Sequence, residues 1–490
     1  MTRRASGNVQ RIADIRVALT SGRVAPGDPL AAAQARHRET HGLLNALVQE
    51  RFAAAAREAE IAAGPLAGVP LSVKECFAVA GLRTTLGIAA RRDVIDTADA
   101  PLVARLRAAG AVVVGKANVP QAMFLHETDN PVWGRTNHPH DAARGPGGSS
   151  GGDAALVAAG VVPLALGNDL AGSLRQPAHA CGIATVMPRF TMLGDGGGFD
   201  TLPHLTALRP RAGFLAREVA DLRAALAAVG LPPSVTDRPL TIGWWTDAGP
   251  IPASPAIRRG VAEAVARLEA AGVATRPLDG GLAAAAAMLH LAIVSAHGTG
   301  DIRRLFAGER PIRGVERLLR LGGMPRWLRP AVAGFARLVG RRVEADGLLA
   351  TGPRDAAGRA ALLTARDTLA ARFADLARGC DAIVCPVSAL PALRHGTAAR
   401  LVLAAAPCLL ANLLDLPAGA VPVTRVRPDE ETSRGFSCDP VLRAAADCDR
   451  GSRGLPVGVQ VVGGRGADES VVLDVLETIE RGAAGPAAVG

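Results

Sequence analysis

The chain of 490 residues contains no tyrosine and only two lysines, Lys74 and Lys116; the other 53 of its 55 basic residues are arginines. It also lacks any run that approaches the roughly 18 consecutive apolar residues of a membrane span, which argues against an integral membrane protein. Hydrophobic residues at 49 % and charged residues at 20 % are ordinary for a globular protein. The composition therefore also argues against disorder.

The seven cysteines are odd in number and form no CxxC pair, unlike those of zinc or redox sites. We expect reduced, mostly buried thiols. The cysteines are Cys76, Cys181, Cys380, Cys385, Cys408, Cys438 and Cys448.

The formal net charge of +10 does not indicate a nucleic-acid partner, because the arginines are spread along the chain without long basic runs. Usage rich in Arg, Ala, Gly and Pro is more typical of a high-GC genome than of a selected charge. The first residues, MTRR, lead into polar sequence and not into the apolar core of a secretory signal. We therefore expect a cytoplasmic protein.

A chain of this length forms one large α/β domain or two smaller ones. No internal repeat or linker divides it, so we predict a single domain over residues 1–490. Residues 1–62 are rich in Ala, Arg and Leu and predict a helical N-terminal scaffold. The apolar positions at helical spacing are Leu43, Leu44, Leu47, Val48 and Phe52.

Short apolar runs alternate with helix-like segments from Gly64 onward, which is typical of a buried sheet with crossover helices. We therefore predict a layered α/β core. The predicted strands are residues 68–73, 111–115, 240–245, 382–386, 420–423 and 457–462. The predicted helices are residues 100–109, 154–159, 216–229, 255–271 and a terminal helix after residue 462.

Two glycine turns that carry serine suggest a site. Residues 145–152 (GPGGSSGG) have the composition of a flexible linker. However, apolar sequence flanks them, and a second turn, residues 167–173 (GNDLAGS), follows soon after. Glycines let several backbone N–H groups point at one spot, the arrangement that stabilises an oxyanion when a serine attacks a carbonyl. Ser173 is the candidate nucleophile.

A serine nucleophile needs a base to take its proton. None of the ten histidines lies in a motif that indicates this role. Lys74, at the end of the apolar strand that begins at Gly68, is the other available base. Burial disfavours a charged ammonium, whereas a guanidinium is not deprotonated in proteins. Taken alone, Lys74 is equally well explained as a chance surface lysine.

These motifs together resemble the amidase signature family over nearly the whole chain. The matching segments are residues 64–70 (GPLAGVP), 147–152, 169–175 and 454–460 (GLPVGVQ). More narrowly, the chain resembles the fatty acid amide hydrolase branch. The segments that carry this second resemblance are residues 74–77 (KECF), 85–87 (TLG), 118–121 (NVPQ), Met123, 130–131, 414–419 (LDLPAG) and 421–424 (VPVT). The resemblance implies a large mixed β-sheet sandwiched by helices, and a serine hydrolase with a Ser-Ser-Lys triad and no cofactor.

Carried over position by position, the resemblance implies that Ser173 attacks the amide carbonyl, Ser149 relays the proton and Lys74 is the ultimate base. Ser149 would follow a cis peptide bond. The implied oxyanion hole consists of the backbone N–H groups of Leu170, Ala171, Gly172 and Ser173. The positions that either contact the substrate or support the loop are Met123, Ser150, Asp169 and Arg175.

The surroundings of Ser173 depart from the family pattern. The family usually has Thr-Asp-x-Gly-Gly-Ser, whereas this chain has Asn168 in place of the threonine and Ala171 in place of the first glycine. The Cβ atom of Ala171 could restrict the oxyanion hole. Residues 185–189 (TVMPR) replace the usual Gly-Leu-Lys-Pro-Thr, and the glycine-rich residues 194–198 are predicted as a loop and not a nucleotide site.

Residues 303–342 combine eleven arginines and two glutamates with apolar residues such as Trp327. We predict an amphipathic surface element, which aligns roughly with the membrane-facing cap of the fatty acid amide hydrolase branch. Arginines would meet anionic headgroups there in a peripheral membrane contact. Packing against the core and a homodimer contact are the open alternatives.

His138 and His140 flank a proline and have no carboxylate cluster nearby in the sequence, so we predict an exposed turn there and assign no metal.

We expect hydrolysis of an apolar, fatty-acid-like acyl amide through an acyl-enzyme on Ser173. The partner is then a small-molecule amide and not a nucleic acid. Three other functions stay open: an acyltransferase that passes the same acyl group to an amine, the A subunit of a glutamine amidotransferase, and a catalytically silent scaffold or binding protein. Residues 74–77 argue against the amidotransferase subunit.

Overall fold

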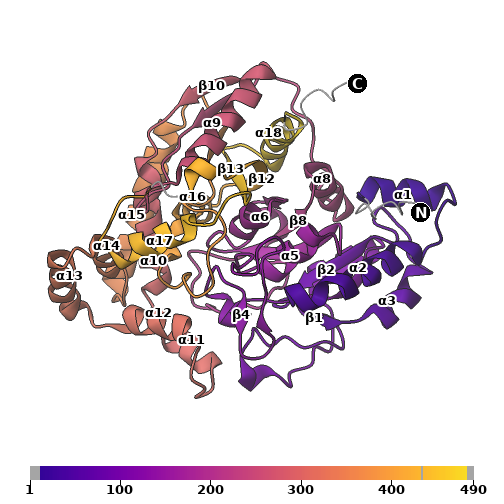
Figure 1. The fold of residues 1–490 in the computed structure, drawn as a ribbon, viewed down its shortest axis with the longest axis horizontal. Helices are drawn as coiled ribbons and strands as arrows, with labels where there is room; N and C mark the ends of the chain where they lie inside the picture. The colour runs from indigo at the N-terminus through magenta and orange to yellow at the C-terminus, as the bar shows by residue number, and fades with distance from the viewer. Residues whose placement is uncertain (1–10, 432–433, 483–490) are drawn as a thin grey trace.

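The computed structural model describes residues 11–431 and 434–482 (Figure 1). The first ten residues, on which the expectation of a missing signal depends, lie outside the described residues, as do the last eight of the range 1–490. Eleven strands form one sheet in the order β1-β3-β2-β6-β8-β7-β12-β13-β11-β9-β10. The strands are β1 (Leu47–Glu50), β2 (Pro70–Lys74), β3 (Val112–Ala117), β6 (Leu164–Asp169), β7 (Ala184–Met187), β8 (Arg211–Ala216), β9 (Thr241–Trp244), β10 (Ala274–Pro277), β11 (Ala382–Pro386), β12 (Ala418–Arg425) and β13 (Pro456–Gly463).

The sheet is mixed. Strand β2 runs parallel to β3 and β6, and β9 runs parallel to β10 and β11, whereas the other neighbours pair antiparallel. The predicted α/β/α class is therefore confirmed. The predicted core strands, and the predicted helices after residue 62, all overlap elements of the structure.

Helices cover both faces of the sheet because the side chains of each strand alternate between two cores. In β6, Leu164 and Leu166 pack into one core and Ala165 packs into the other. The first core is covered by α1 (Ile12–Thr20), α4 (Pro101–Ala108), α8 (Val219–Ala228), α9 (Pro255–Ala270) and α18 (Glu469–Arg481). The second is covered by α2 (Asp28–Leu44), α3 (Phe52–Ala59), α5 (Gly151–Ala159), α10 (Gly281–Ser295), α15 (Ala356–Leu376) and α16 (Ala406–Leu413).

One prediction for the N-terminal scaffold is wrong. Leu47 and Val48, predicted as helical, lie in the edge strand β1. Helix α2 ends at Leu44 and is capped by Asn45, whose φ of 49° is left-handed, and the chain then pairs antiparallel with β3. A short apolar run does not distinguish a helix from a strand, and here pairing with the sheet decides the outcome.

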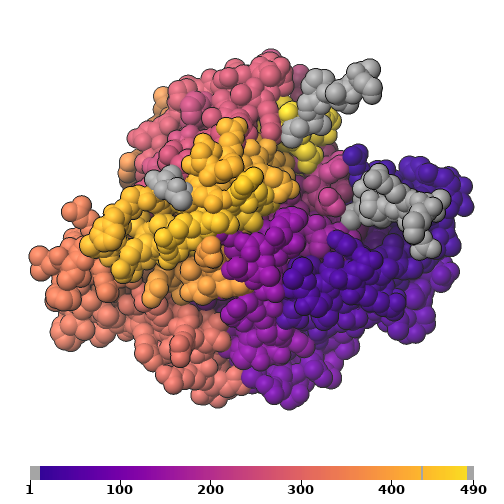
Figure 2. Space-filling view, viewed as in Figure 1, coloured from indigo at the N-terminus to yellow at the C-terminus, as the bar shows by residue number. Residues whose placement is uncertain are grey.

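The arginine-rich segment forms a group of helices at the lower left of Figures 1 and 2. They are α11 (Gly300–Leu305), α12 (Arg313–Gly323), α13 (Arg329–Leu338) and α14 (Arg342–Ala350). Trp327, Phe335 and Leu338 are 79 %, 67 % and 86 % exposed. The segment thus presents large apolar side chains to solvent. Within residues 11–431 and 434–482, no helix is long and apolar enough to cross a membrane.

Candidate active site

The predicted base and nucleophile lie at one edge of the sheet. Strands β2 and β6 are parallel neighbours, and they end at Lys74 and Asp169. Open α/β sheets bind ligands beyond the carboxyl ends of such strands. The loop before α5, a helix labelled near the centre of Figure 1, brings Ser149 to this edge against Lys74. The turn that carries Ser173 follows β6, and the Ser150 N–H donates to the Ser173 carbonyl at 3.1 Å.

Lys74 is fully buried, and its Nζ lies 2.7 Å from Ser149 Oγ. Nζ also donates to Asn168 Oδ1 at 2.6 Å and to the Asn168 backbone oxygen at 3.3 Å. Both of these oxygens are acceptors only, so they take two N–H groups of the amine. In the neutral amine the remaining position is the lone pair, which faces the Ser149 hydroxyl.

Burial lowers the pKa of Lys74, because removal from water disfavours the ammonium. The nearby Cys76, Asp153 and Asp169 act in the opposite direction but do not reverse the shift. Burial also raises the pKa of Asp153 to about 7, although Ser72 Oγ donates to its Oδ1 at 2.8 Å. Lys74 therefore gives up its proton more readily than a lysine in water.

The two serines are placed differently. Ser149 follows a cis peptide bond with Gly148, as the resemblance implies. Ser149 and Ser173 are 2 % and 8 % exposed. Within the part of the chain that the structure describes, no hydrogen bond joins the two hydroxyls. The structure thus brings Ser149 against Lys74 and places Ser173 in the turn beside them.

The turn that carries Ser173 is anchored by a buried ion pair. Asp169 accepts the N–H groups of Gly172 at 2.6 Å and Leu174 at 3.1 Å. Arg175, which begins α6 (Arg175–Cys181), donates to both carboxylate oxygens at 3.1 and 3.2 Å. Burial alone would raise the pKa of Asp169, but Arg175 and these N–H groups hold it well below its usual range. A charged carboxylate therefore fixes the turn.

The remaining donors of Arg175 are also satisfied. They reach the Cys408 carbonyl at 3.0 Å, Gln460 Oε1 at 2.9 Å and Asn412 Oδ1 at 2.6 Å. Sequence analysis did not single out Asn412, which lies in α16. Gln460 ends the GLPVGVQ segment, so a signal for it was present in the sequence.

The turn offers backbone N–H groups. Among residues 11–431 and 434–482, the N–H groups of Leu170, Ala171 and Ser173 have no acceptor, whereas Gly172 donates to Asp169. Gly172 has a φ of 93°, and a Cβ atom there would lie 2.9 Å from Cys408 Cβ. Ala171 does not have a positive φ, so its side chain imposes no left-handed backbone strain.

Two histidines hold the carbonyls of this turn. His126 Nε2 lies 3.1 Å from the Ala171 oxygen, and His290 Nε2 lies 3.0 Å from the Leu170 oxygen. Burial lowers the pKa of each histidine to about 4, so both are neutral at pH 7. Because a carbonyl only accepts, the proton of each ring sits on Nε2. No motif marks either residue, and sequence analysis missed both.

Met123 lies in a strained segment next to the glycine loop. Ala122 and Met123 have φ values of 54° and 59°, a region that side chains rarely adopt. The Ala122 N–H donates to the Leu86 oxygen at 2.8 Å, which holds this conformation. The segment packs against the loop, since a Cβ atom on Gly148 would meet the Leu125 oxygen at 2.6 Å.

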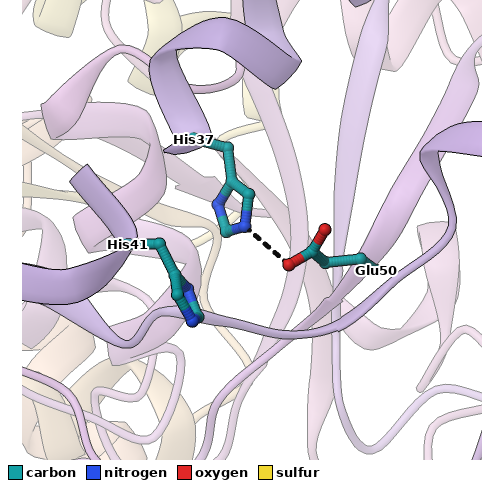
Figure 3. Close-up of side chains that lie close together, drawn as sticks. All are labelled: His37, His41 and Glu50. Carbon is teal, nitrogen blue, oxygen red and sulfur yellow. Dashed lines mark hydrogen bonds and ion pairs between the residues drawn. The ribbon is translucent and has the colours of Figure 1, made fainter. Parts of the chain in front are cut away.

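One group of side chains in the described residues has the spacing of metal ligands. The ligand atoms of His37, His41 and Glu50 all lie within 4.8 Å of one another (Figure 3). Sequence analysis considered only His138 and His140 and missed this group, although two histidines four residues apart in a helix were a visible signal.

The predicted exposure of His138 is wrong. His138 is fully buried, and its Nε2 donates to the Ala180 oxygen at 2.8 Å. Its Nδ1 accepts the backbone N–H of His140 at 3.1 Å. The imidazole is buried because both ring nitrogens find protein partners in the turn.

The structure is an α/β protein in which a mixed sheet lies between helices, and a buried lysine at one strand end contacts a serine of the glycine loop. The model of the amidase family matches residues 29–472, and the chain belongs to that family. It is a hydrolase acting on amide C–N bonds.

Known relatives agree with this assignment. The chain is 32 % identical to fatty-acid amide hydrolase 1 of Sus scrofa over 426 residues, which are 81 % of this chain and 73 % of the relative. It is 37 % identical to indoleacetamide hydrolase of Bradyrhizobium diazoefficiens over 256 residues, or 49 % of this chain and 48 % of that protein. The predicted resemblance to the amidase signature family and its fatty acid amide hydrolase branch is confirmed.

Solved structures share the fold. A fatty acid amide hydrolase has a TM-score of 0.83 at 21 % identity, covering 96 % of this chain and 85 % of that chain. A 6-aminohexanoate cyclic dimer hydrolase has a TM-score of 0.74 at 22 % identity, covering 97 % of each chain.

Proposed function

We propose that the protein cleaves the amide bond of an apolar, fatty-acid-like acyl amide through a Ser-Ser-Lys triad. Ser173 attacks the carbonyl carbon, and its proton passes through Ser149 to Lys74. Lys74 returns a proton through Ser149 to the leaving amine as the C–N bond breaks. Water then hydrolyses the acyl-enzyme. The observation that carries the proposal is the contact of 2.7 Å between the buried Lys74 Nζ and Ser149 Oγ.

The developing oxyanion is proposed to bind the N–H groups of the turn after β6. The donors are Leu170, Ala171, Gly172 and Ser173. Three of these N–H groups have no acceptor among the described residues, and Gly172 would exchange its bond to Asp169 for one to the oxyanion. Removal of one oxyanion-hole donor typically lowers kcat by about 10²- to 10³-fold.

Four further residues have proposed supporting roles. Asp169 and Arg175 hold the turn, because they are fully buried and face protein groups. Ser150 supports the strand end through its hydroxyl, which donates to the Asn168 oxygen at 3.4 Å. Met123 faces the substrate with its backbone. The apolar acyl group is supported by the identity to fatty-acid amide hydrolase 1.

The proposal is tested by intact-mass spectrometry after exposure to a lipophilic fluorophosphonate. Wild type should gain a single adduct that is lost in both Ser173→Ala and Lys74→Ala. Ser21→Ala, at an exposed serine, is the matched control and should label normally. An adduct that persists in Ser173→Ala would contradict the assigned nucleophile. No adduct on folded wild-type protein would favour the silent scaffold.

The acceptor of the acyl group needs a separate experiment. Over 208 residues, 40 % of its length, the chain is 39 % identical to the A subunit of the glutamyl-tRNA(Gln) amidotransferase of Nitratidesulfovibrio vulgaris. We propose water as the acceptor. Turnover of an acyl amide with an excess of a primary amine should yield the free acid; a condensed amide would identify an acyltransferase. Ammonia release from glutamine would identify a glutamine amidotransferase.

We also propose that this enzyme is cytoplasmic and that residues 303–342 contact an anionic membrane surface. The exposed apolar residues Trp327 and Leu338 lie among arginines, an arrangement that suits headgroups and acyl chains together. Vesicles of phosphatidylglycerol should co-sediment wild type, and the double variant Trp327→Ser/Leu338→Ser should stay in solution. Ile61→Ser, which changes an equally exposed apolar residue elsewhere, should still sediment. A dimer in light scattering that the double variant abolishes would instead identify a dimer contact.

A further inference from the structure

In the turn after β6, side chains bind the carbonyl oxygens of two consecutive peptide planes, on the side opposite to the N–H groups of those planes. In a planar trans peptide, the C=O of one residue and the N–H of the next point in opposite directions and rotate as one unit. Within the described residues, the one cis bond is Gly148–Ser149, so the peptides of the turn are trans. A donor that fixes the Leu170 oxygen therefore fixes the Ala171 N–H, and a donor that fixes the Ala171 oxygen fixes the Gly172 N–H.

His290 and His126 supply these two donors. His290 comes from the middle of α10, and His126 comes from the loop after the strained segment at Met123. Their Nε2 atoms reach the Leu170 and Ala171 oxygens at 3.0 and 3.1 Å. Two neutral rings from separate elements thus hold consecutive carbonyls of one turn.

We propose that His126 and His290 are positioning residues: His290 orients the free Ala171 N–H toward the oxyanion, and His126 holds the next peptide plane, whose Gly172 N–H donates to Asp169. This inference rests on the proposed acyl-enzyme function. Neither ring reaches the reacting atoms in this role; each acts through a peptide plane. The neutral rings keep their donor across the neutral pH range and add no charge beside the developing oxyanion.

The surroundings of His290 support a role beyond packing. Its Nδ1 is buried and has no hydrogen-bond partner in the part of the chain that the structure describes. Leaving a buried polar atom unpaired is unfavourable, and such atoms in native proteins call for an explanation. An apolar side chain would fill the position without this penalty. Compared with an apolar side chain, the imidazole of His290 provides one additional interaction, the hydrogen bond to the Leu170 oxygen.

Matched substitutions distinguish a hydrogen-bonding role of each histidine from a role in packing alone. His126→Gln and His290→Gln keep an N–H donor near the place of Nε2, whereas His126→Met and His290→Met keep the bulk without a donor. In each Met variant, we expect kcat for an octanoyl amide of aminomethylcoumarin to fall about tenfold or more, with KM unchanged. Binding of an octyl trifluoromethyl ketone, which forms an oxyanion on Ser173, should weaken by the same factor. The Gln variants should recover most of both losses.

The outcomes distinguish this inference from the proposed function. If wild type fails to label with the fluorophosphonate, the acyl-enzyme proposal fails first. If wild type labels and turns over but the folded Met variants keep wild-type kcat, the positioning role is wrong. It is also wrong if Gln and Met variants lose kcat equally and unfold at equally lowered temperatures, because the histidines then act only through packing.

A different observation supports a metal site far from this turn in the sequence. His37 and His41 lie one helical turn apart on the same side of α2, and Glu50 ends the edge strand β1 (Figure 3). His37 Nε2 and Glu50 Oε1 are 2.9 Å apart. Two ligands that each lie about 2.0–2.2 Å from a tetrahedral zinc ion are about 3.3–3.6 Å apart, so these two hydrogen-bonded atoms would separate by less than about 1 Å to admit the ion.

We infer that His37, His41 and Glu50 bind a divalent cation of the zinc type. Imidazole nitrogens and a carboxylate are ligands that zinc prefers. The cation would replace the proton that His37 and Glu50 share. Because His41 and Glu50 are exposed, water can complete the coordination. The cation would tie α2 to the edge of the sheet.

The metal site is tested with untagged, chelator-treated full-length protein. Calorimetric titration with Zn²⁺ should show one equivalent bound, and Co²⁺ should give the visible spectrum of a tetrahedral site. His41→Ala and Glu50→Gln change exposed residues and should each weaken binding at least about tenfold. His204→Ala, at another exposed histidine, should bind as wild type does. No binding, or binding that both variants retain, would overturn the inference.

Discussion

The two lysines of the chain lie on neighbouring parallel strands and are both fully buried, yet their surroundings differ. Lys116 pairs with the carboxylate of Asp96 at 3.2 Å. Among residues 11–431 and 434–482, the hydrogen-bond partners of Lys74 are neutral groups of Ser149 and Asn168. Lys116 is level with Val73 in the sheet, so the two lysines point to opposite faces.

The difference shows that burial alone does not make a base. Burial lowers the pKa of both lysines. A carboxylate in contact stabilises the ammonium and keeps its proton, whereas neutral oxygens hold the amine in place and let the proton leave. The contacts of Lys116 are those of a structural ion pair, and the contacts of Lys74 suit proton transfer.

The largest effect should come from removing each lysine in turn. We expect Lys74→Met to lower kcat/KM for acyl-amide hydrolysis by about 10²- to 10⁴-fold, the usual contribution of a general base. Lys116→Met should keep the wild-type value per folded molecule. Steady-state kinetics with the folded fraction measured by circular dichroism check both. A Lys74 variant with a tenth or more of the wild-type rate would contradict the assigned base.

For the free energy of unfolding we expect the opposite order, with a larger loss in Lys116→Met than in Lys74→Met. Lys116→Met leaves Asp96, whose side chain is 10 % exposed, without its partner. Breaking a buried pair in this way destabilises a protein by about 3–5 kcal/mol. Denaturant titration should show the largest loss for Lys116→Met and partial recovery in Lys116→Met/Asp96→Asn. If the double variant is no more stable than the single one, the ion pair is not what the lysine provides.

A carboxylate introduced beside Lys74 should stabilise its ammonium, so that Lys74 keeps its proton as Lys116 does beside Asp96. In Asn168→Asp, the new charge stabilises the ammonium and raises the pKa of Lys74. Because only the amine accepts a proton, kcat/KM at pH 7 should fall and should recover as the pH is increased. In wild type, where burial lowers the pKa, the loss of activity should begin at lower pH.

Asp96→Asn is the mirror change beside Lys116 and should leave the pH dependence of kcat/KM unchanged. Thermal unfolding of both variants controls for misfolding. An Asn168→Asp enzyme whose activity fails to recover at higher pH, though folded, would contradict this account of the pKa.

Site residues could be predicted from the sequence where they lie together in one contiguous motif. The two glycine turns and the strand that ends at Lys74 each form a contiguous motif, and parallel strands then bring Lys74 and Asn168 together. The short apolar runs separated by helices predicted the layered α/β core, and the resemblance to the amidase signature family implied that its sheet is mixed. It did not distinguish β1 from a helix, since an apolar run of that length fits both.

The missed residues reach the turn only through the fold. His290 and Asn412 lie 120 and 243 residues from their partners in the turn. A histidine that donates to a backbone carbonyl leaves no pattern in the sequence, because a carbonyl is present at every residue. The tertiary arrangement alone selects which histidine meets which carbonyl.

The smallest effect should come from Asn168, where the chain departs from the family. Its Oδ1 accepts from Lys74 Nζ at 2.6 Å, so we interpret the asparagine as a replacement for the family's threonine and not as damage. Asn168→Leu removes that acceptor at similar size and should lower kcat/KM about two- to tenfold, the net contribution of one hydrogen bond. Asn168→Thr should lie between wild type and the leucine variant. If kcat/KM of Asn168→Thr instead exceeds the wild-type value more than tenfold, Asn168 impairs Lys74 as a base. The neutral contacts of Lys74 would then not by themselves account for its role.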